Sequence, residues 1–206
     1  MATSNTAITL EGEVQPSSVR ISSNAQEHWY ALRTTYGREK KAYDYITEHG
    51  GKAFLPIITI EKTVRGKKKL LEVSRLPNIF FAFGTEEDIK CFVYDNVNLP
   101  FLRFYYDKTR SGAQGVKTPL VVPDRQMRAL QLICGCPMDC DTVILPVAVP
   151  KFKTGERVRV VEGQFKGVEG IVARFKGQQR VGIVIEQLLT VATAYIPSAF
   201  LERITE

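Results

Sequence analysis

The sequence predicts an α+β fold in which an antiparallel α/β sandwich is followed by a small β-barrel. In residues 28–133, segments with strand character and segments with helical spacing follow one another in the order β-α-β-β-α-β-α. This order is typical of an antiparallel sheet with helices mainly on one side. In residues 151–206, four segments rich in β-branched residues are separated by turns, which favours a five-stranded barrel that closes its own edges.

The first half of the sandwich begins with a strand and a helix. Residues 28–33 alternate in side-chain character as a strand does, and residues 38–49 carry apolar side chains at helical spacing. Two glycines then end the helix. Residues 53–60 are expected to form the next strand, and residues 61–73 a hairpin with its tip at Arg65-Gly66.

The second half of the sandwich begins with residues 76–83, an apolar strand entered through a proline. Residues 85–94 follow as a helix, because Thr85 can cap its start and the acidic residues of the first turn suit the helix dipole. Residues 101–106 are expected to form a further strand. A third helix is expected over residues 123–133.

The expected barrel strands carry many Val and Ile residues, which favour strand over helix. Phe165 is expected to stand out of the loop between the first two strands, because its neighbours Gln164 and Lys166 are polar. A hydrophobic plug inside the loop is an equally good interpretation of this residue. The expected strands are residues 157–161, 171–175, 180–186 and 190–196.

Two further segments are expected to lack regular structure. Residues 1–27 are rich in Ser, Thr, Asn and Gln and carry no secretory pattern, which predicts a disordered tail. Residues 134–150 contain three prolines and are expected to form an irregular linker between two domains. No apolar run approaches the ~20 residues that cross a bilayer. We therefore expect a cytoplasmic protein without a membrane partner.

The net charge of +6 is concentrated in two basic clusters. Such clusters favour an anionic partner, usually nucleic acid, and the alternative is a solvated surface that only keeps the protein soluble. The first cluster begins the first helix, where cations and free backbone N–H groups can both address phosphate. The clusters consist of Arg38, Lys40 and Lys41, and of Lys62, Arg65, Lys67, Lys68 and Lys69.

Cys134, Cys136 and Cys140 form a Cys-x-Cys-x-x-x-Cys motif. Structural zinc sites usually pair Cys-x-x-Cys units and need a fourth ligand, whereas both histidines of this chain lie far away in sequence. The sequence also offers no nucleophile with an adjacent base and no phosphate-binding glycine loop. We therefore expect no metal, no cofactor and no enzymatic activity.

A set of motifs marks residues 28–133: Trp29-Tyr30 on the first strand, Pro56 at the second, the basic hairpin, and Leu-Pro-Asn-Ile-Phe-Phe at residues 76–81. This set resembles the N-terminal domain of NusG-type transcription elongation factors. Residues 54–69 look like the specialised paralogue RfaH. Residues 122–127 are similar to the UpxY-type antiterminators of capsular polysaccharide loci.

A second motif lies in residues 155–172, which read Gly-Glu-x-Val-x-Val-x-x-Gly-x-Phe-x-Gly-x-x-Gly-x-Val. This pattern resembles a KOW module, a small SH3-like barrel. The two resemblances follow one another in the order found in the family and together cover residues 28–206. They imply a NusG-like N-terminal domain at 28–133 and a KOW domain at 151–206.

The resemblance implies a role in transcription without catalysis. NusG-like N-terminal domains grip the clamp helices of the largest RNA polymerase subunit and suppress pausing or termination. The nucleic-acid partner would be non-template DNA or nascent RNA, and the KOW module would recruit a ribosomal protein or a termination factor. We expect a monomer that acts at specific operons, such as capsular polysaccharide loci.

The polymerase contact is expected to be an apolar patch on the strand after Pro77. Alternate residues of a strand face opposite sides, so Ile79 and Phe81 share one face, and Phe80 lies on the other as a core residue. Because the helices are expected to cover only one face, the Ile79 face is the candidate site. Compared with RfaH, Arg33 replaces an aromatic residue. The resemblance implies polymerase binding by Tyr30, Leu76, Pro77, Ile79 and Phe81, nucleic-acid binding by the two basic clusters, and binding of the KOW partner by Phe165 and Lys166.

A KOW-type ribosomal or translational RNA-binding protein is the alternative function, because KOW modules also occur in such proteins. The discriminating feature is the N-terminal domain. A ribosomal KOW protein would not need the Trp-Tyr strand or the Leu-Pro-Asn-Ile-Phe segment, so these motifs favour polymerase binding.

Overall fold

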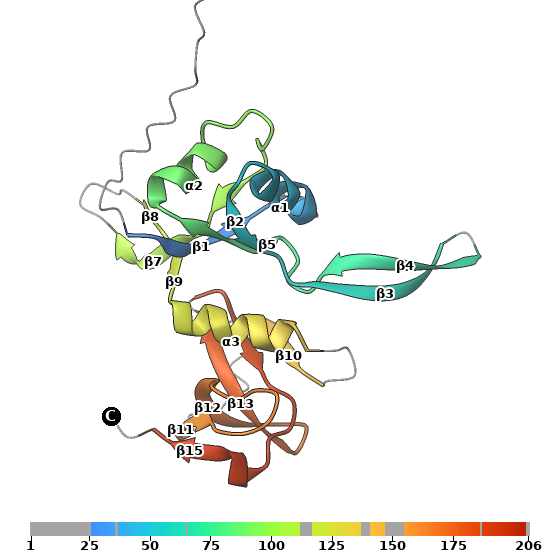
Figure 1. The fold of residues 1–206 in the computed structure, drawn as a ribbon, viewed down its shortest axis with the longest axis vertical. Helices are drawn as coiled ribbons and strands as arrows, with labels where there is room; N and C mark the ends of the chain where they lie inside the picture. The colour runs from blue at the N-terminus through green and yellow to red at the C-terminus, as the bar shows by residue number, and fades with distance from the viewer. Residues whose placement is uncertain are drawn as a thin grey trace, which may run out of the picture.

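A computed structural model describes residues 26–35, 37–64, 66–111, 117–136, 141–146, 155–185 and 187–204. An N-terminal body and a β-rich C-terminal body lie on the two sides of helix α3 (Asp124–Cys134), as Figure 1 shows. All but the last two residues of the expected tail, residues 1–27, fall outside the described residues.

The N-terminal body is built on a five-stranded antiparallel sheet. Its strands run in the order β2-β5-β1-β6, and β9 also pairs with β1. Helices α1 (Glu39–Glu48) and α2 (Glu86–Val93) lie on one face. The predicted cap of α2 is confirmed, because the Thr85 hydroxyl accepts a hydrogen bond from the backbone N–H of Asp88 at 3.2 Å. The strands are β1 (His28–Arg33), β2 (Lys52–Phe54), β5 (Ile79–Gly84), β6 (Arg103–Phe104) and β9 (Val121–Val122).

Both faces of this sheet are covered. Leu32 and Phe80 pack beneath α1 and α2 in one buried cluster, whereas Ala31 and Phe81 pack in a second cluster with residues of α3. The α+β class is confirmed, but the expectation that helices cover only one face is wrong. Strand β9 pairs with β1 and leads directly into α3, so the apolar side of α3 folds back over the free face of the sheet.

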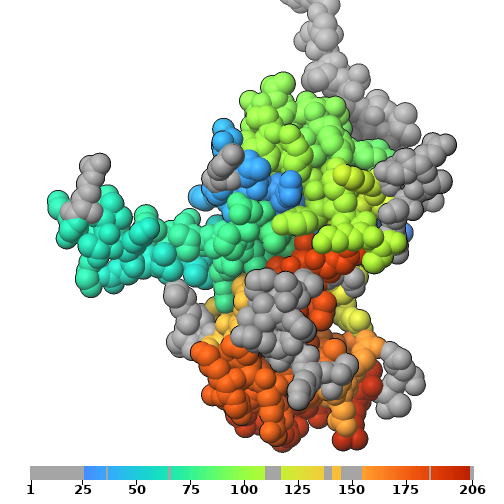
Figure 2. Space-filling view, turned by 180° about the vertical axis from the view of Figure 1, so that it is seen from behind, coloured from blue at the N-terminus to red at the C-terminus, as the bar shows by residue number. Residues whose placement is uncertain are grey.

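Strands β3 (Ile57–Val64) and β4 (Lys67–Ser74) form a separate two-stranded ribbon. The ribbon projects from the body as an arm in Figure 1 and Figure 2. Val64 pairs with Lys67, which confirms the predicted tip at residues 65–66. Gly66 has φ +75, a conformation that favours glycine. A second ribbon pairs β7 (Tyr106–Ser111) with β8 (Lys117–Pro119).

The C-terminal body is a six-stranded antiparallel sheet, in the order β10-β14-β13-β12-β11-β15. The prediction of strands rather than helices is confirmed. This body, which we call the barrel, has one strand more than expected, and its pairing leaves β10 and β15 as edge strands instead of closing its own edges. A Cβ atom at Gly170 would lie 2.4 Å from the carbonyl oxygen of Gly182, so the close approach of two strands requires glycine there. The strands are β10 (Val143–Pro146), β11 (Arg157–Val160), β12 (Glu169–Phe175), β13 (Gln178–Ile185), β14 (Leu189–Ala192) and β15 (Leu201–Arg203).

The expectation of an irregular linker over residues 134–150 is wrong in two places. Helix α3 extends to Cys134, and Val143–Pro146 form β10, which pairs with β14. β10 lies at the edge of the barrel sheet, where a proline is tolerated because no neighbouring strand needs its missing N–H. The rest of this segment falls partly outside the described residues.

One hydrophobic cluster joins the two bodies. It runs from Phe81 in the sheet, through Met127 and Leu130 of α3, to Val181 and Ile183 in the barrel. Helix α3 therefore buries apolar side chains towards both bodies, and the barrel lies against the same side of the sheet that carries Phe81.

Candidate functional site

The sheet face beneath α3 ends in a row of three side chains. Ile79 of β5 lies opposite Arg33 of β1, and Arg33 lies opposite Arg103 of β6. The preceding row on this face contains Phe81 opposite Ala31. The predicted grouping of Ile79 with Phe81 on one face is confirmed, and two arginines join Ile79 at the end of the sheet.

The apolar candidates on this face differ in accessibility. Phe81 is 0% exposed and Leu76 is 3% exposed, because both pack in the cluster that α3 and the barrel share. Ile79 is half-buried at the margin of this cluster, and Pro77 is exposed. The expectation of an exposed apolar patch is therefore wrong: among the candidates on this face, Pro77 and part of Ile79 reach the surface, and Leu76 and Phe81 do not.

Tyr30 lies on the face opposite to the other candidates. It pairs with Ala82 and packs in the cluster beneath α1 and α2, with 3% of its surface exposed. Burial raises the pKa of its hydroxyl, and the charges of Glu86 and Glu87 add to this effect. The resemblance groups Tyr30 with Ile79 and Phe81, but the structure places it on the opposite face of the sheet, so this grouping is wrong.

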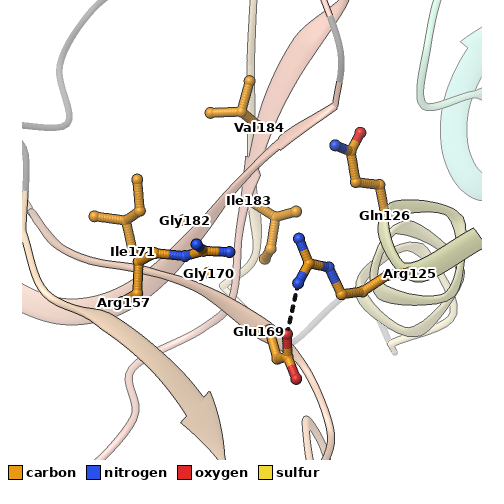
Figure 3. A pocket seen from close by; sticks show the side chains of 9 residues that line it. All are labelled: Arg125, Gln126, Arg157, Glu169, Gly170, Ile171, Gly182, Ile183 and Val184. Carbon is orange, nitrogen blue, oxygen red and sulfur yellow. Dashed lines mark hydrogen bonds and ion pairs between the residues drawn. The ribbon is translucent and has the colours of Figure 1, made fainter. Parts of the chain in front are cut away.

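An ion pair joins α3 to the barrel, as Figure 3 shows, and a second ion pair within the barrel shares its carboxylate. Arg125 Nη1 lies 2.9 Å from Glu169 Oε2, and Arg159 Nη2 lies 2.7 Å from Glu169 Oε1. The hydrogen bonds from Arg159 and from Arg125 hold the pKa of Glu169 below its ordinary value. A cavity of about 170 Å³ lies beside this pair, lined by the start of α3 and by residues of β11, β12 and β13.

Two further sets of hydrogen bonds, which are not ion pairs, also hold the barrel against the N-terminal body. Gln187 Nε2 donates to Asp107 Oδ1 at 2.7 Å, and Gln187 Oε1 accepts from the backbone N–H of Lys108 at 2.9 Å. The Arg75 guanidinium donates to Thr142 Oγ1 at 2.7 Å and to carbonyl oxygens at the end of α3. We call these contacts, together with the Arg125–Glu169 ion pair, the seam.

Phe165 lies inside the protein. Only 3% of its surface is exposed, and it belongs to the cluster shared by α3 and the barrel. Its loop turns through Gly163 and Gly167, which both have positive φ, and this turn directs the ring inward. The expectation that Phe165 stands out of the loop is wrong, and the hydrophobic plug is the interpretation that fits. Its neighbour Lys166 is exposed.

The first basic cluster lies at the N-terminus of α1. Arg38 precedes the helix, and its Cζ atom lies 4.9 Å from the centroid of the Phe101 ring. Lys41 Nζ lies 5.7 Å from the same centroid. Lys40 Nζ lies 3.8 Å from a carboxylate oxygen of Glu72 on β4. Arg38 and Lys41 therefore share one aromatic ring, and Lys40 connects the helix to the ribbon.

The second basic cluster is divided between the two faces of the ribbon. Lys62 lies opposite Lys69, and Lys67 is on the same face. Lys68 is on the other face, where its Nζ lies 2.7 Å from Glu61 Oε1. The ribbon therefore separates a lysine face from a face whose charge is partly neutralised. Lys62, Lys67, Lys68 and Lys69 are all exposed, and Arg65 falls outside the described residues.

The cysteine motif falls only partly within the described residues, because Cys140 lies outside them. Burial raises the pKa of the Cys134 thiol to about 11, and the Cys136 thiol donates to the carbonyl oxygen of Leu132 at 3.2 Å. Across the described ranges, no three His, Cys, Asp or Glu side chains are placed to hold a metal ion. No helix within these ranges is both long enough and apolar enough to cross a membrane.

The family model described as "Transcription termination factor nusG" matches residues 27–131, just over half of the chain. A solved structure titled "Domain interaction in Thermotoga maritima NusG" is 19% identical in sequence; the match covers 87% of this chain and 98% of that chain, with a TM-score of 0.44. The family match spans the whole N-terminal sheet, α1, α2 and most of α3. The chain therefore belongs to the NusG family of transcription factors.

Proposed function

We propose that the chain is an elongation and antitermination factor that binds the clamp helices of RNA polymerase and suppresses pausing or termination. The UpxY-like residues 122–127 support action at specific operons, such as capsular polysaccharide loci. The observation that carries the proposal is the placement of the Leu76–Phe81 segment. Its apolar side faces away from α1 and α2 and reaches the surface at Pro77 and Ile79.

The clamp helices would bind first at this accessible end of the face. Leu76 and Phe81 would join the interface when the barrel leaves α3, because a helical tip gains most from buried apolar anchors. The Arg125–Glu169 ion pair of the seam involves a largely exposed arginine, and exposed pairs contribute at most about 1 kcal/mol. A partner that replaces the apolar contacts between the barrel and α3 can therefore compete with the barrel for this face of the sheet.

Nucleic acid is the proposed partner of the two basic clusters. Arg38 and Lys41 stand on one aromatic ring at the N-terminus of α1, and the lysine face of the ribbon projects away from the body. Their charges supply sequence-independent attraction to phosphates, which suits non-template DNA or nascent RNA. Lys40 and Lys68, which form ion pairs, would contribute less.

The barrel is proposed to recruit a ribosomal protein or a termination factor through Lys166 and Phe165. Phe165 is buried in the cluster shared with α3, so it would reach a partner only after the barrel separates from α3. Polymerase binding by the N-terminal body and partner binding by the barrel would then require the same opening. The protein is proposed to act as a cytoplasmic monomer.

Binding of the full chain to a purified hairpin that carries the clamp helices tests the proposal. Ile79→Asp is expected to weaken this binding by more than about tenfold, because it places a charge in the apolar contact. The control is Val97→Asp, since Val97 is 88% exposed and lies outside this face. Equal binding by both variants would reject the proposed surface. Recovery of ribosomal RNA instead of polymerase from lysate would favour the translational alternative.

A further inference from the structure

We propose that Arg33 and Arg103 form a carboxylate-binding pair that receives an acidic side chain of the polymerase coiled-coil tip. This inference rests on the proposed function, because it concerns the accessible end of the same sheet face. It adds the chemistry of the partner, namely an apolar tip with an acidic residue beside the apolar contact.

The two arginines lie side by side on neighbouring strands. Arg33 of β1 is directly opposite Arg103 of β6, a position at which the Cβ atoms are about 4.5–5.5 Å apart. Like charges placed in this way destabilise a sheet. An anion between the two guanidinium groups would turn this repulsion into attraction.

The part of the chain that the structure describes supplies no such anion. Among the residues that the structure describes, neither Arg33 nor Arg103 forms an ion pair. Arg103 Nη1 donates to the neighbouring carbonyl oxygen of Leu102 at 2.6 Å, and the charge of Arg103 opposes the rise in the pKa of Tyr94 that burial causes. A guanidinium has five N–H donors in a planar fork that matches a carboxylate, so most of the donors of the pair remain available to a partner.

The pair is accessible while most of the face is covered. Both arginines are exposed, whereas Phe81 in the preceding row is fully buried. Tyr105 is half-buried next to them on the same face: burial raises the pKa of its hydroxyl, and the charge of Arg33 opposes this rise. We call the arrangement in which the barrel lies against α3 the closed state, and the one in which it has left α3 the open state. A partner that approaches the closed protein meets Pro77, Ile79 and the two arginines together.

The apolar neighbour indicates a polypeptide rather than a phosphate backbone. Ile79 is directly opposite Arg33 on the side away from Arg103, so the row combines an aliphatic contact with two cations. Arginine beside apolar anchors is typical of protein interfaces. The proposed phosphate-binding residues Arg38 and Lys41 instead lie over the ring of Phe101, which packs in the cluster on the opposite face of the sheet.

The test measures binding of the full chain to the purified clamp-helix hairpin at low and at high salt. Arg33→Gln and Arg103→Gln are each expected to weaken binding by about tenfold and to reduce its salt dependence. Arg174→Gln is the matched control, since Arg174 is also an exposed strand arginine but lies in the barrel. Both site variants are expected to be at least as stable to urea as the wild-type protein, because each removes a like-charge contact.

Three results would overturn the inference. If the wild-type chain binds the hairpin and both Arg33→Gln and Arg103→Gln bind it equally well, the carboxylate site is wrong and the proposed function stands. If the variants lose affinity for a single-stranded DNA oligonucleotide and keep it for the hairpin, the arginines belong to the nucleic-acid surface. If the wild-type chain does not bind the hairpin at all, the inference fails together with the proposed function.

Discussion

Arg125 of α3 and Glu169 of β12 form a 2.9 Å ion pair across the seam between the N-terminal body and the barrel. Glu169 Oε1 also accepts hydrogen bonds from Arg159 Nε and Nη2, at 2.9 and 2.7 Å. One carboxylate therefore joins a guanidinium of α3 to a guanidinium of the barrel. This arrangement makes the closed state depend on the ionised form of Glu169.

We expect the seam to weaken in acid. The arginines hold the pKa of Glu169 below its ordinary value of 4.5 in the closed state. Arg159 belongs to the barrel and lowers this pKa in both states, so only the part due to Arg125 of α3 favours the closed state. This part is present above pH 4.5 and is lost as the pH falls through the lowered pKa. Because Arg125 is largely exposed, the effect should not exceed about 1 kcal/mol, or about a fivefold shift towards the open state. Small-angle scattering would register it as a larger radius of gyration.

Two variants separate this effect from general acid unfolding. Glu169→Gln is expected to be more open already at neutral pH. Its radius of gyration should not increase further as the pH falls below 4.5. Glu162→Gln changes an exposed carboxylate of the barrel and is expected to behave as the wild-type protein does. A radius that changes identically in all three proteins would contradict a role for Glu169.

Arg180 is a structural residue of the barrel, with 0% of its surface exposed. Its guanidinium donates to the carbonyl oxygen of Thr193 at 3.1 Å and to Gln178 Oε1 at 2.8 Å, and it pairs with Asp141. We expect Arg180→Ala to lower the free energy of unfolding by about 2–4 kcal/mol, because it leaves a cavity and removes these bonds. Urea denaturation measures the change. Arg174→Ala, at an exposed position of β12, should cost less than about 0.5 kcal/mol, and equal losses would argue against the buried network.

Features that depend on adjacent residues could be predicted from the sequence. The cap of α2 requires only Thr85 and the backbone that follows it, and the ribbon tip requires a glycine between two strands of suitable composition. The start of α3 after Pro123 follows from the same kind of local preference. Each of these signals lies within a few residues of the feature that it predicts.

Features that depend on distant pairing could not be predicted. The alternation along β1 is visible in the sequence, but tertiary packing decides which side of the sheet α1 covers, so the sequence alone does not predict the face of Tyr30. Phe165 is buried in a cluster that also contains residues of α3 and of other barrel strands, and these partners lie outside the loop sequence. The partners of Glu169 and Gln187 in the seam lie 44 and 80 residues away along the chain. These residues carry no local signal of their role.

Asn78 adopts a left-handed conformation, with φ +65, in the turn between Pro77 and Ile79. Its backbone N–H donates to the buried carboxylate of Glu39, and its carbonyl oxygen accepts from the backbone N–H of Thr34 at 3.1 Å. These two contacts hold the turn against the start of α1 and the end of β1. They therefore position the accessible part of the proposed polymerase-binding surface.

We expect Asn78→Val to lower the free energy of unfolding by about 1–2 kcal/mol, because a β-branched side chain opposes the left-handed conformation that the two backbone contacts impose. Asn78→Gly keeps both backbone contacts and permits positive φ, so it should change stability by no more than about 0.5 kcal/mol. Urea denaturation of the two variants measures the difference. Since the turn carries Pro77 and Ile79, the valine variant should also bind the clamp helices more weakly than the glycine variant. Equal stability of the two variants would show that the turn relaxes to another conformation at little cost.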